Sequence, residues 1–270
     1  MKFNTKCVHG SGRPDSTGAI SPAIYMSSTF SHPQLGDTTG YQYTRESNPT
    51  RDRLEQLIAG LEEGTDALAF SSGMAAVDAV FHLFSPGDHI ILGDDLYGGS
   101  IRMFTNIYEQ NGIEFTYVGT SDLDAVKAAF KPNTKAVYIE TPTNPMMEIT
   151  DIRALCALAH ERNALVIIDN TFLSPYFQKP LTLGADIVVH SGTKFIGGHH
   201  DVISGFTIVK DDELAAKLRL TYKTVGACLS AMDSWLVIRG VKTLALRMEQ
   251  HQKNAIALAE WLKTQPKVTK

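Results

Sequence analysis

The sequence predicts an α/β fold, built on a mostly parallel sheet with helices on both faces. Two observations support this prediction. From about residue 66 onward, short apolar runs alternate with segments of helical periodicity. Several of these runs, such as Leu165 to Ile168, are apolar throughout instead of alternating, which is typical of strands buried on both faces. With 270 residues the chain exceeds the usual size of one small domain, and we expect one large domain with appendages.

The first 47 residues predict an extended arm with little core of its own. They show no sustained periodicity, and Gly, Ser, Thr and Pro are scattered among them. Tyr25 and Phe30 contribute to an aromatic content higher than that of a solvated tail, so we expect the arm to lie on another surface. It ends at Asn48, a helix N-cap followed by Pro49 at the first helical position, which predicts a helix that closes near residue 64.

Strands and helices alternate from there. The predicted strands are 66–70, 89–92, 115–118, 136–139, 165–168, 187–189 and 206–209, which together make a seven-stranded sheet. The predicted helices are 73–84, 100–110, 122–130, 151–163, one from 211, and a mostly helical segment over 232–263 broken at Gly240. We divide the chain into an arm over 1–47, a large domain over 48–230, and a long helix over 231–270 leading to a truncated C-terminal domain.

The composition argues against nucleic acid and membrane as partners. The chain has 25 Lys and Arg against 29 Asp and Glu, a net charge of −4, with no long run of either sign. Its three cysteines are far apart and form no CxxC pair, which argues against a disulfide framework or structural zinc and favours a reducing compartment. No stretch approaches the ~20 apolar residues of a membrane helix, and the N-terminus lacks an apolar signal core. We therefore expect a cytoplasmic protein.

The stretch that follows the predicted strand 187–189 points to a reactive lysine. Ser191 and Thr193 lead directly to Lys194. A lysine at the end of a buried strand loses hydration, which favours the neutral amine that attacks a carbonyl to form a Schiff base. The two hydroxyls suit a phosphate held beside it, and pyridoxal phosphate carries both an aldehyde and a phosphate. An ordinary surface lysine is the alternative that this stretch alone leaves open.

Other candidate residues follow the ends of further strands, where ligands bind in open α/β sheets. Gly73 and Met74 open a helix whose free N–H groups can hold a phosphate, although a glycine needed only for the turn is the alternative. Tyr97 can stack on a flat cofactor or simply pack on its loop, and Asn144 can donate to a carboxylate or ring oxygen. Asp169 directly follows an apolar run and needs a cation or several donors, and a protonated pyridine nitrogen would be such a cation.

Seven longer segments, most of which contain these candidate residues, can be compared with known families. They are Tyr43-Thr-Arg45-Glu-Ser-Asn-Pro-Thr50, Ser71-Ser-Gly-Met-Ala75, Asp95-Leu-Tyr-Gly-Gly99, Glu140-Thr-Pro-Thr-Asn-Pro145, Asp169-Asn-Thr171, His190-Ser-Gly-Thr-Lys194 and Arg239-Gly-Val-Lys-Thr-Leu244. Over essentially the whole chain they resemble the cystathionine synthase and lyase family of pyridoxal-phosphate enzymes, the transsulfuration branch of the fold shared with aspartate aminotransferase. The resemblance implies an aspartate-aminotransferase-like large domain and a small C-terminal domain.

The resemblance also implies a role for each candidate residue. Lys194 forms the Schiff base and shuttles protons, Asp169 pairs with the pyridine nitrogen, and Tyr97 stacks on the ring and takes part in catalysis. Tyr43 and Arg45 reach the cofactor phosphate of a neighbouring subunit, within a homotetramer built from two dimers. Further implied cofactor contacts are Gly73, Met74, Ser191, Thr193, Thr171 and Asn144, of which the first four bind the phosphate.

Two features depart from the family pattern. Gly192 stands where many relatives have alanine or cysteine. The family normally continues into a small C-terminal domain that carries the arginine gripping the substrate carboxylate, whereas this sequence stops at Lys270. We therefore expect either that the chain is a fragment or that it lacks the arginine that binds the substrate carboxylate, and the sequence is compatible with both.

The implied activity acts at the β- or γ-carbon of a sulfur amino acid, foremost as a carbon–sulfur lyase on cystathionine of the γ- or β-lyase type. Cystathionine γ-synthase or O-acylhomoserine thiol-lyase is the alternative, and methionine γ-lyase is disfavoured because such enzymes typically carry a cysteine at the position of Gly99. Two more distant readings are a metal-dependent hydrolase using His199, His200 and Asp201, and a catalytically silent protein that binds pyridoxal phosphate.

Overall fold

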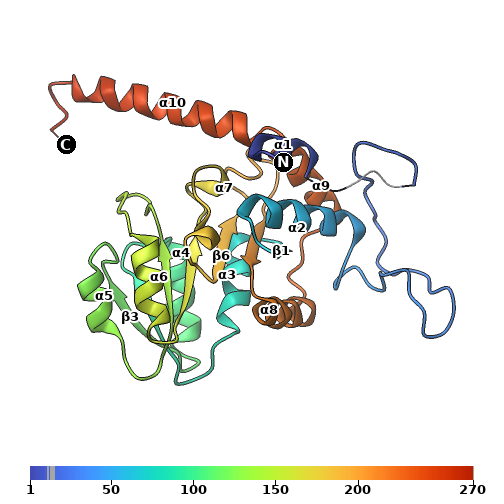
Figure 1. The fold of residues 1–270 in the computed structure, drawn as a ribbon, viewed down its shortest axis with the longest axis horizontal. Coiled ribbons are helices and arrows are strands. Elements are labelled where there is room, and N and C mark those ends of the chain that lie inside the picture. Colours follow the sequence, from blue (N-terminus) through green and yellow to red (C-terminus); the bar gives the residue numbers. More distant parts are fainter. Residues whose placement is uncertain (11, 13–15, 270) are drawn as a thin grey trace.

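The computed structural model describes residues 1–10, 12 and 16–269. A sheet of seven strands forms its centre, in the order β1-β7-β6-β5-β4-β2-β3 (Figure 1). The strands are β1 (Asp66–Phe70), β2 (His89–Gly93), β3 (Glu114–Val118), β4 (Thr134–Glu140), β5 (Leu165–Asp169), β6 (Ile187–Ser191) and β7 (Gly205–Val209). Neighbouring strands are parallel except at β7, which is antiparallel to both β1 and β6. The prediction of a mostly parallel seven-stranded sheet is confirmed.

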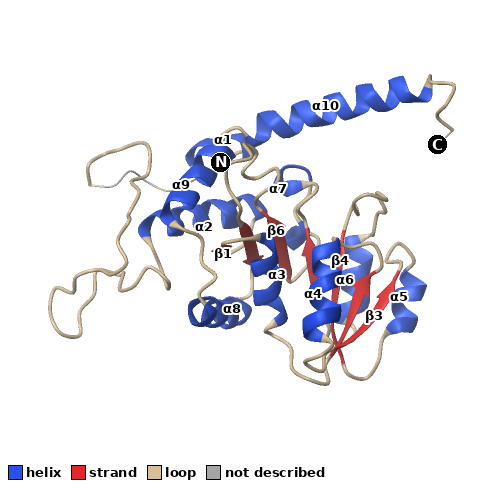
Figure 2. Cartoon of the chain, turned by 180° about the vertical axis from the view of Figure 1, so that it is seen from behind, coloured by secondary structure: helices blue, strands red, loops and turns tan. Residues whose placement is uncertain are grey.

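Helices cover both faces of this sheet (Figure 2). One face carries α3 (Gly73–Phe81), α4 (Gly98–Met103) continued by the π-helix η1 (Phe104–Tyr108), and α8 (Asp212–Val225). The other face carries α2 (Pro49–Glu62), α5 (Leu123–Ala129), α6 (Ile152–His160) and α9 (Ala231–Val241). The remaining helices are α1 (Phe3–His9), the single turns α7 (Ser174–Phe177) and η2 (Pro180–Thr182), and α10 (Leu244–Lys263).

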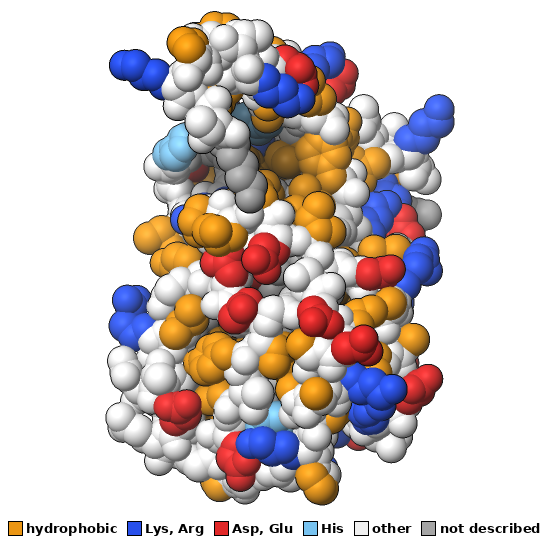
Figure 3. Space-filling model, turned by 90° about the vertical axis from the view of Figure 1, so that its left-hand side faces the viewer, with side chains coloured by type: hydrophobic (Ala, Val, Ile, Leu, Met, Phe, Trp, Pro, Cys, Tyr) orange, Lys and Arg blue, Asp and Glu red, His pale blue; other side chains and the backbone are white. Residues whose placement is uncertain are grey.

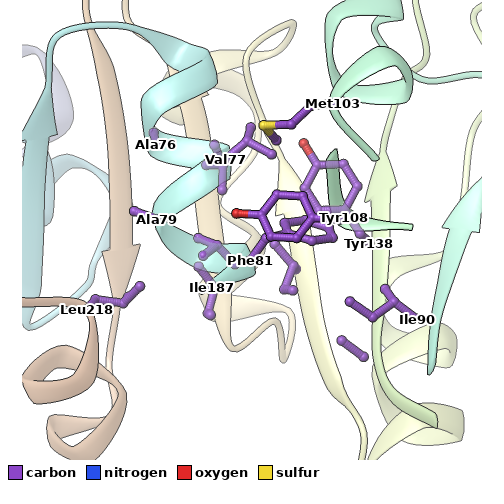
Figure 4. Packing of buried hydrophobic residues seen from close by; sticks show 14 of the residues in the cluster. Ala76, Val77, Ala79, Phe81, Ile90, Met103, Tyr108, Tyr138, Ile187 and Leu218 are labelled. Carbon is purple, nitrogen blue, oxygen red and sulfur yellow. The ribbon is translucent and has the colours of Figure 1, made fainter. Parts of the chain in front are cut away.

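The apolar strands are buried on both sides because their side chains alternate between two cores. On β6, Ile187 and Val189 pack with α3 and α8, whereas Val188 packs with α2 and α9 on the other face. Figure 4 shows the first of these cores, where Phe81 lies between Tyr108 and Ile187. Burial on both faces favours apolar residues in such a strand, which explains the uninterrupted apolar run from Ile187 to Val189.

The predicted helix start at residue 48 is correct. The Asn48 side chain accepts a hydrogen bond from the Thr50 N–H at 2.9 Å, and Pro49 occupies the first helical position of α2. This cap satisfies a donor that the helix itself leaves without a partner. The start of α2 is consequently fixed where the arm ends.

The extended arm was expected to begin at the N-terminus, but the first residues form a helix instead. Residues 3–9 form α1, whose Cys7 is buried against α2, and Lys6 Nζ donates to the Gly60 carbonyl at 2.9 Å. A seven-residue helix with one buried side chain shows little periodicity in the sequence. Farther along, Trp235 Nε1 donates to the Pro22 carbonyl at 3.1 Å, and much of the segment up to residue 47 is exposed.

The predicted break at Gly240 is wrong, because this glycine lies inside α9. The helical segment breaks instead at Lys242 and Thr243, between α9 and α10. A Cβ on Gly240 would lie 2.2 Å from the Gly197 carbonyl oxygen, so the glycine permits a close backbone approach and does not end the helix. Beyond Met248 the residues of α10 are exposed, and the helix extends away from the sheet (Figures 1 and 2). In the part of the chain that the structure describes, no helix combines the length and apolar character needed to cross a membrane.

Candidate active site

A cavity of about 1040 Å³ opens at the edge of the sheet where the parallel strands end. Its walls come from the segments that follow β1, β2, β4, β5 and β6, which is the usual ligand site of an open α/β sheet. Of the candidate residues, the cavity is lined by Gly73, Met74, Tyr97, Asn144, Asp169, Thr171, Ser191, Thr193 and Lys194.

One end of the cavity is suited to an anion. The helix α3 begins there at Gly73, and the N–H groups of a first helical turn lack partners within the helix. A Cβ on Gly73 would lie 2.8 Å from Ser191 Cβ, so only a glycine lets the helix start come this close to β6. The same wall carries Ser191 and Thr193, and the Thr193 hydroxyl is held by Ser204, to whose carbonyl it donates at 3.2 Å and whose N–H it accepts at 3.1 Å. The N–H groups of the helix start and the Ser191 hydroxyl form a cradle of uncharged donors, with Thr193 beside it.

Asp169 ends β5 and faces the same cavity. Burial raises the pKa of this carboxyl, while hydrogen bonds from Thr171 and the charge of His190 lower it. The Thr171 N–H donates to Asp169 Oδ1 at 3.0 Å. A cation placed against the carboxylate would offset the cost of burying it.

The loop that carries Tyr97 is attached to the end of β4. Glu140, the last residue of β4, accepts the Tyr97 N–H at 3.1 Å through Oε2. Glu140 is 7% exposed, and burial, followed by the charge of Asp169, raises its pKa to about 8. The Tyr97 ring itself is exposed on the cavity wall, where a flat ligand can lie against it.

Lys194 lines the cavity, but its side chain is exposed, and the expected loss of hydration is therefore wrong for this chain. The reason is that β6 ends at Ser191 and Lys194 lies in the turn beyond it. That turn is tight, because Gly197 N donates to the Gly192 carbonyl at 2.8 Å and Gly198 N to the Lys194 carbonyl at 2.8 Å. The lysine is thus fixed at its backbone, with its amine free to reach a ligand.

The lysine turn is also held from α10. The Arg247 guanidinium donates to the carbonyls of Phe195 at 2.7 Å and of Gly240 at 3.1 Å. Its Nε donates to Thr243 Oγ1 at 3.0 Å. A planar group with several donors can hold several carbonyls at once, and Arg247 does so directly behind the lysine.

Tyr43 and Arg45 do not line the cavity of this chain. Arg45 Nη1 donates to the Lys223 carbonyl near the end of α8, and the guanidinium carbon lies 5.4 Å from the centre of the Tyr43 ring. Tyr43 forms an isolated antiparallel bridge with Thr29. Both residues therefore lie on the arm, outside the site that their own chain builds.

Sequence reasoning missed several residues of the cavity wall, among them Glu140, Arg247 and His251. Glu140 had a detectable signal, since it is an acid directly after an apolar run, as Asp169 is. Arg247 and His251 lie on α10 more than 50 residues beyond the lysine, and no local pattern links them to it.

The geometry gives the metal-dependent hydrolase no support. Among the residues that the structure describes, no group of three or more His, Cys, Asp and Glu side chains is arranged to hold a metal ion. His199 Nδ1 lies 2.8 Å from the Gly197 carbonyl oxygen, a contact within its own turn.

On the face shown in Figure 3, Lys and Arg side chains are scattered among Asp and Glu and form no single basic patch.

The residues of the cavity fit pyridoxal phosphate. The cradle at Gly73 suits its phosphate, the carboxyl of Asp169 suits its ring nitrogen, and the amine of Lys194 suits its aldehyde. The fold and the site therefore define an α/β enzyme that depends on this cofactor.

Comparison with known proteins leads to the same class. The family model described as Cys/Met metabolism PLP-dependent enzyme matches residues 4–270. Cystathionine γ-lyase of Bacillus subtilis (strain 168) is 49% identical over 269 residues, which are 99% of this chain and 71% of the relative. Cystathionine β-lyase of Lactococcus lactis subsp. cremoris (strain MG1363) is 50% identical with the same coverage. Relatives named cystathionine γ-synthase match at 45 to 47% identity.

A solved structure agrees with these sequences. The crystal structure of cystathionine γ-lyase from Lactobacillus plantarum complexed with L-serine matches with a TM-score of 0.98 and 50% identity, covering 100% of this chain and 71% of that chain. The chain belongs to the family of pyridoxal-phosphate-dependent enzymes of cysteine and methionine metabolism. It is an enzyme of the cystathionine lyase and synthase group, and its cofactor is pyridoxal 5′-phosphate.

Proposed function

We propose that this enzyme cleaves the carbon–sulfur bond of cystathionine, as a lyase of the γ or β type. The observation that carries the proposal is the meeting of Lys194, Asp169 and the helix start at Gly73 around one cavity. Relatives at 49 and 50% identity include lyases of both types, which supports the reaction class and leaves the position of cleavage to experiment. An alternative within the same site is γ-synthase or O-acylhomoserine thiol-lyase chemistry.

Each part of the cavity has a separate task in this proposal. The N–H groups of Gly73 and Met74 and the hydroxyls of Ser191 and Thr193 bind the phosphate, and Thr171 holds Asp169 in place. Bound pyridoxal phosphate supplies an electron sink for the negative charge that develops on the substrate Cα.

The remaining residues act on the substrate and the ring. The Lys194 amine, whose backbone is held by its turn, accepts the Cα proton and donates a proton to the leaving group of the substrate. Asp169 keeps the ring nitrogen protonated, and Tyr97 lies against the ring. Asn144 donates its amide to the substrate carboxylate.

We also propose that the enzyme is a homotetramer of two dimers, in which Tyr43 and Arg45 complete the cofactor site of a neighbouring subunit. Their position on the exposed arm, away from the cavity of their own chain, supports this arrangement. Residues 48–230 would then form the cofactor-binding domain, and α9 and α10 would connect it to the C-terminal domain.

The purified protein should be yellow. Borohydride should remove the colour and leave the mass of the cofactor on the peptide containing Lys194. Lys194→Ala is the matched control and should take up no label. With cystathionine as substrate, 2-oxobutyrate plus cysteine identifies a γ-lyase, and pyruvate plus homocysteine a β-lyase. Consumption of an O-acylhomoserine only when cysteine is present supports the γ-synthase. A labelled protein that releases no product would overturn the enzymatic proposal and leave a silent cofactor-binding protein.

A further inference from the structure

Two carboxyl groups lie side by side on one wall of the cavity. Glu140 and Asp169 are register partners at the ends of the parallel strands β4 and β5. Neighbouring strands are ~4.8 Å apart and partners in register point to the same face, so both carboxyls line the cavity. One of them, Asp169, is assigned above to the ring nitrogen. The other has no task in the proposed reaction.

Glu140 connects the two loops on either side of this wall. Its Oε2 accepts the Tyr97 N–H at 3.1 Å, and a hydrogen bond from the Asn144 backbone also acts on the carboxyl. These loops carry the ring-stacking tyrosine and the substrate-binding amide of the proposed site. A residue with 7% exposure that holds both loops is well placed to set their distance from the ligand.

The surroundings of the pair decide which carboxyl carries the charge. Glu140 is faced by Asp169 on β5 and by Asp95 after β2, both acidic, and Lys194 lines the cavity from the β6 side. Burial raises the pKa of Asp169 as well, but the Thr171 hydrogen bonds and the charge of His190 behind the sheet act in the opposite direction and favour its anion. Two adjacent carboxylates in a poorly solvated wall repel each other, and such a pair retains one proton.

We propose that Glu140 is a positioning residue of this active site, an uncharged carboxyl that holds the Tyr97 loop while the single negative charge of the pair stays on Asp169. The inference rests on the cofactor site proposed above. With Glu140 neutral, the wall presents one charge to the ring nitrogen and one hydrogen-bond acceptor to the loop. With Glu140 ionised, the Tyr97 loop would rest on a second unpaired charge.

The test compares Glu140→Gln with Glu140→Leu. Glutamine is uncharged and keeps an acceptor for the Tyr97 N–H, so cofactor affinity, measured by fluorescence titration of the cofactor-free chain, should stay within about threefold of wild type. Leucine leaves that N–H without a partner and should weaken the affinity by about tenfold or more. Glu109→Gln, at an exposed carboxyl that does not line the cavity, is the control.

A second measurement uses wild type without cofactor and does not depend on the leucine variant folding. The infrared spectrum of wild type minus that of Glu140→Gln should show the band of a protonated carboxyl near neutral pH, whereas wild type minus Glu109→Gln should not. Burial also raises the pKa of Glu55, to about 7, but the contribution of that carboxyl cancels in the subtraction. A difference spectrum of wild type minus Glu140→Gln that lacks this band, or a glutamine variant as impaired as the leucine variant, would overturn the inference. A wild-type chain that shows the band and binds no cofactor would instead refute the proposed function.

Discussion

The raised pKa of Glu140 makes the stability of the chain depend on pH in a direction that can be worked out. The pKa rises from the ordinary value of 4.5 to about 8 on folding, because the carboxyl is buried beside Asp169. The folded state therefore binds this proton more tightly than the unfolded state. Below pH ~4.5 the carboxyl does not lower the unfolding free energy. Between the two pKa values it lowers the unfolding free energy by ~1.4 kcal/mol for each pH unit, and above pH ~8 the accumulated loss stays constant.

Glu140→Gln removes this cost, because glutamine does not titrate. Relative to wild type, the variant should gain about 3 to 4 kcal/mol of unfolding free energy between pH 5 and pH 9, in an otherwise unchanged background. Urea unfolding of both cofactor-free chains at pH 5, 7 and 9 measures the difference directly, and titrating groups that do not interact with Glu140 cancel. A difference that stays flat to within about 1 kcal/mol across this range would refute the reasoning, because Glu140 would then titrate alike in both states.

Two further predictions concern glycines whose neighbours leave no space for a side chain. Gly73→Ala places a Cβ 2.8 Å from Ser191 Cβ and should weaken cofactor binding by about tenfold or more as α3 moves away from β6, whereas Gly98→Ala, where nothing lies within 4 Å, should not. Equal cofactor affinity of the two variants would contradict the cradle. Gly192→Ala places a Cβ 2.3 Å from Phe206 Cε2 and should lower the unfolding free energy by ~1–3 kcal/mol, with partial recovery when Phe206→Leu is added. Purely additive effects in urea unfolding would show that the two side chains do not compete for this space.

The elements that could be predicted from sequence are those whose signal is local. The strands β5 and β6 consist of apolar runs that end in a polar residue, and the N-cap of α2 is contained in Asn48 and Pro49. Because the parallel strands end at one edge, residues read one strand at a time were brought together around the cavity. Strand ends were thus enough to bring nine candidate residues to one cavity.

The features that were missed depend on contacts between distant segments. Gly240 reads as a helix breaker, yet its role is set by the Gly197 carbonyl, 43 residues earlier in the chain. The helix α1 is defined by what it packs on, since only Cys7 among its residues is buried. The exposure of Lys194 follows from where β6 stops, which varies by a few residues in any reading of sequence.

The dependence on contacts between distant segments also explains why the protonation of the site could not be predicted from the sequence. Glu140 and Asp169 are each an acid at the end of an apolar run, and alone each would seek a cation. Only the pairing of β4 with β5 makes them neighbours, and only the charges and hydrogen bonds around each carboxyl, with Asp95 beside Glu140 and His190 beside Asp169, make them unequal. Since the identity of the residues does not contain this difference, the protonation of such a site is a property of strand order and loop contacts, and it changes when those contacts change.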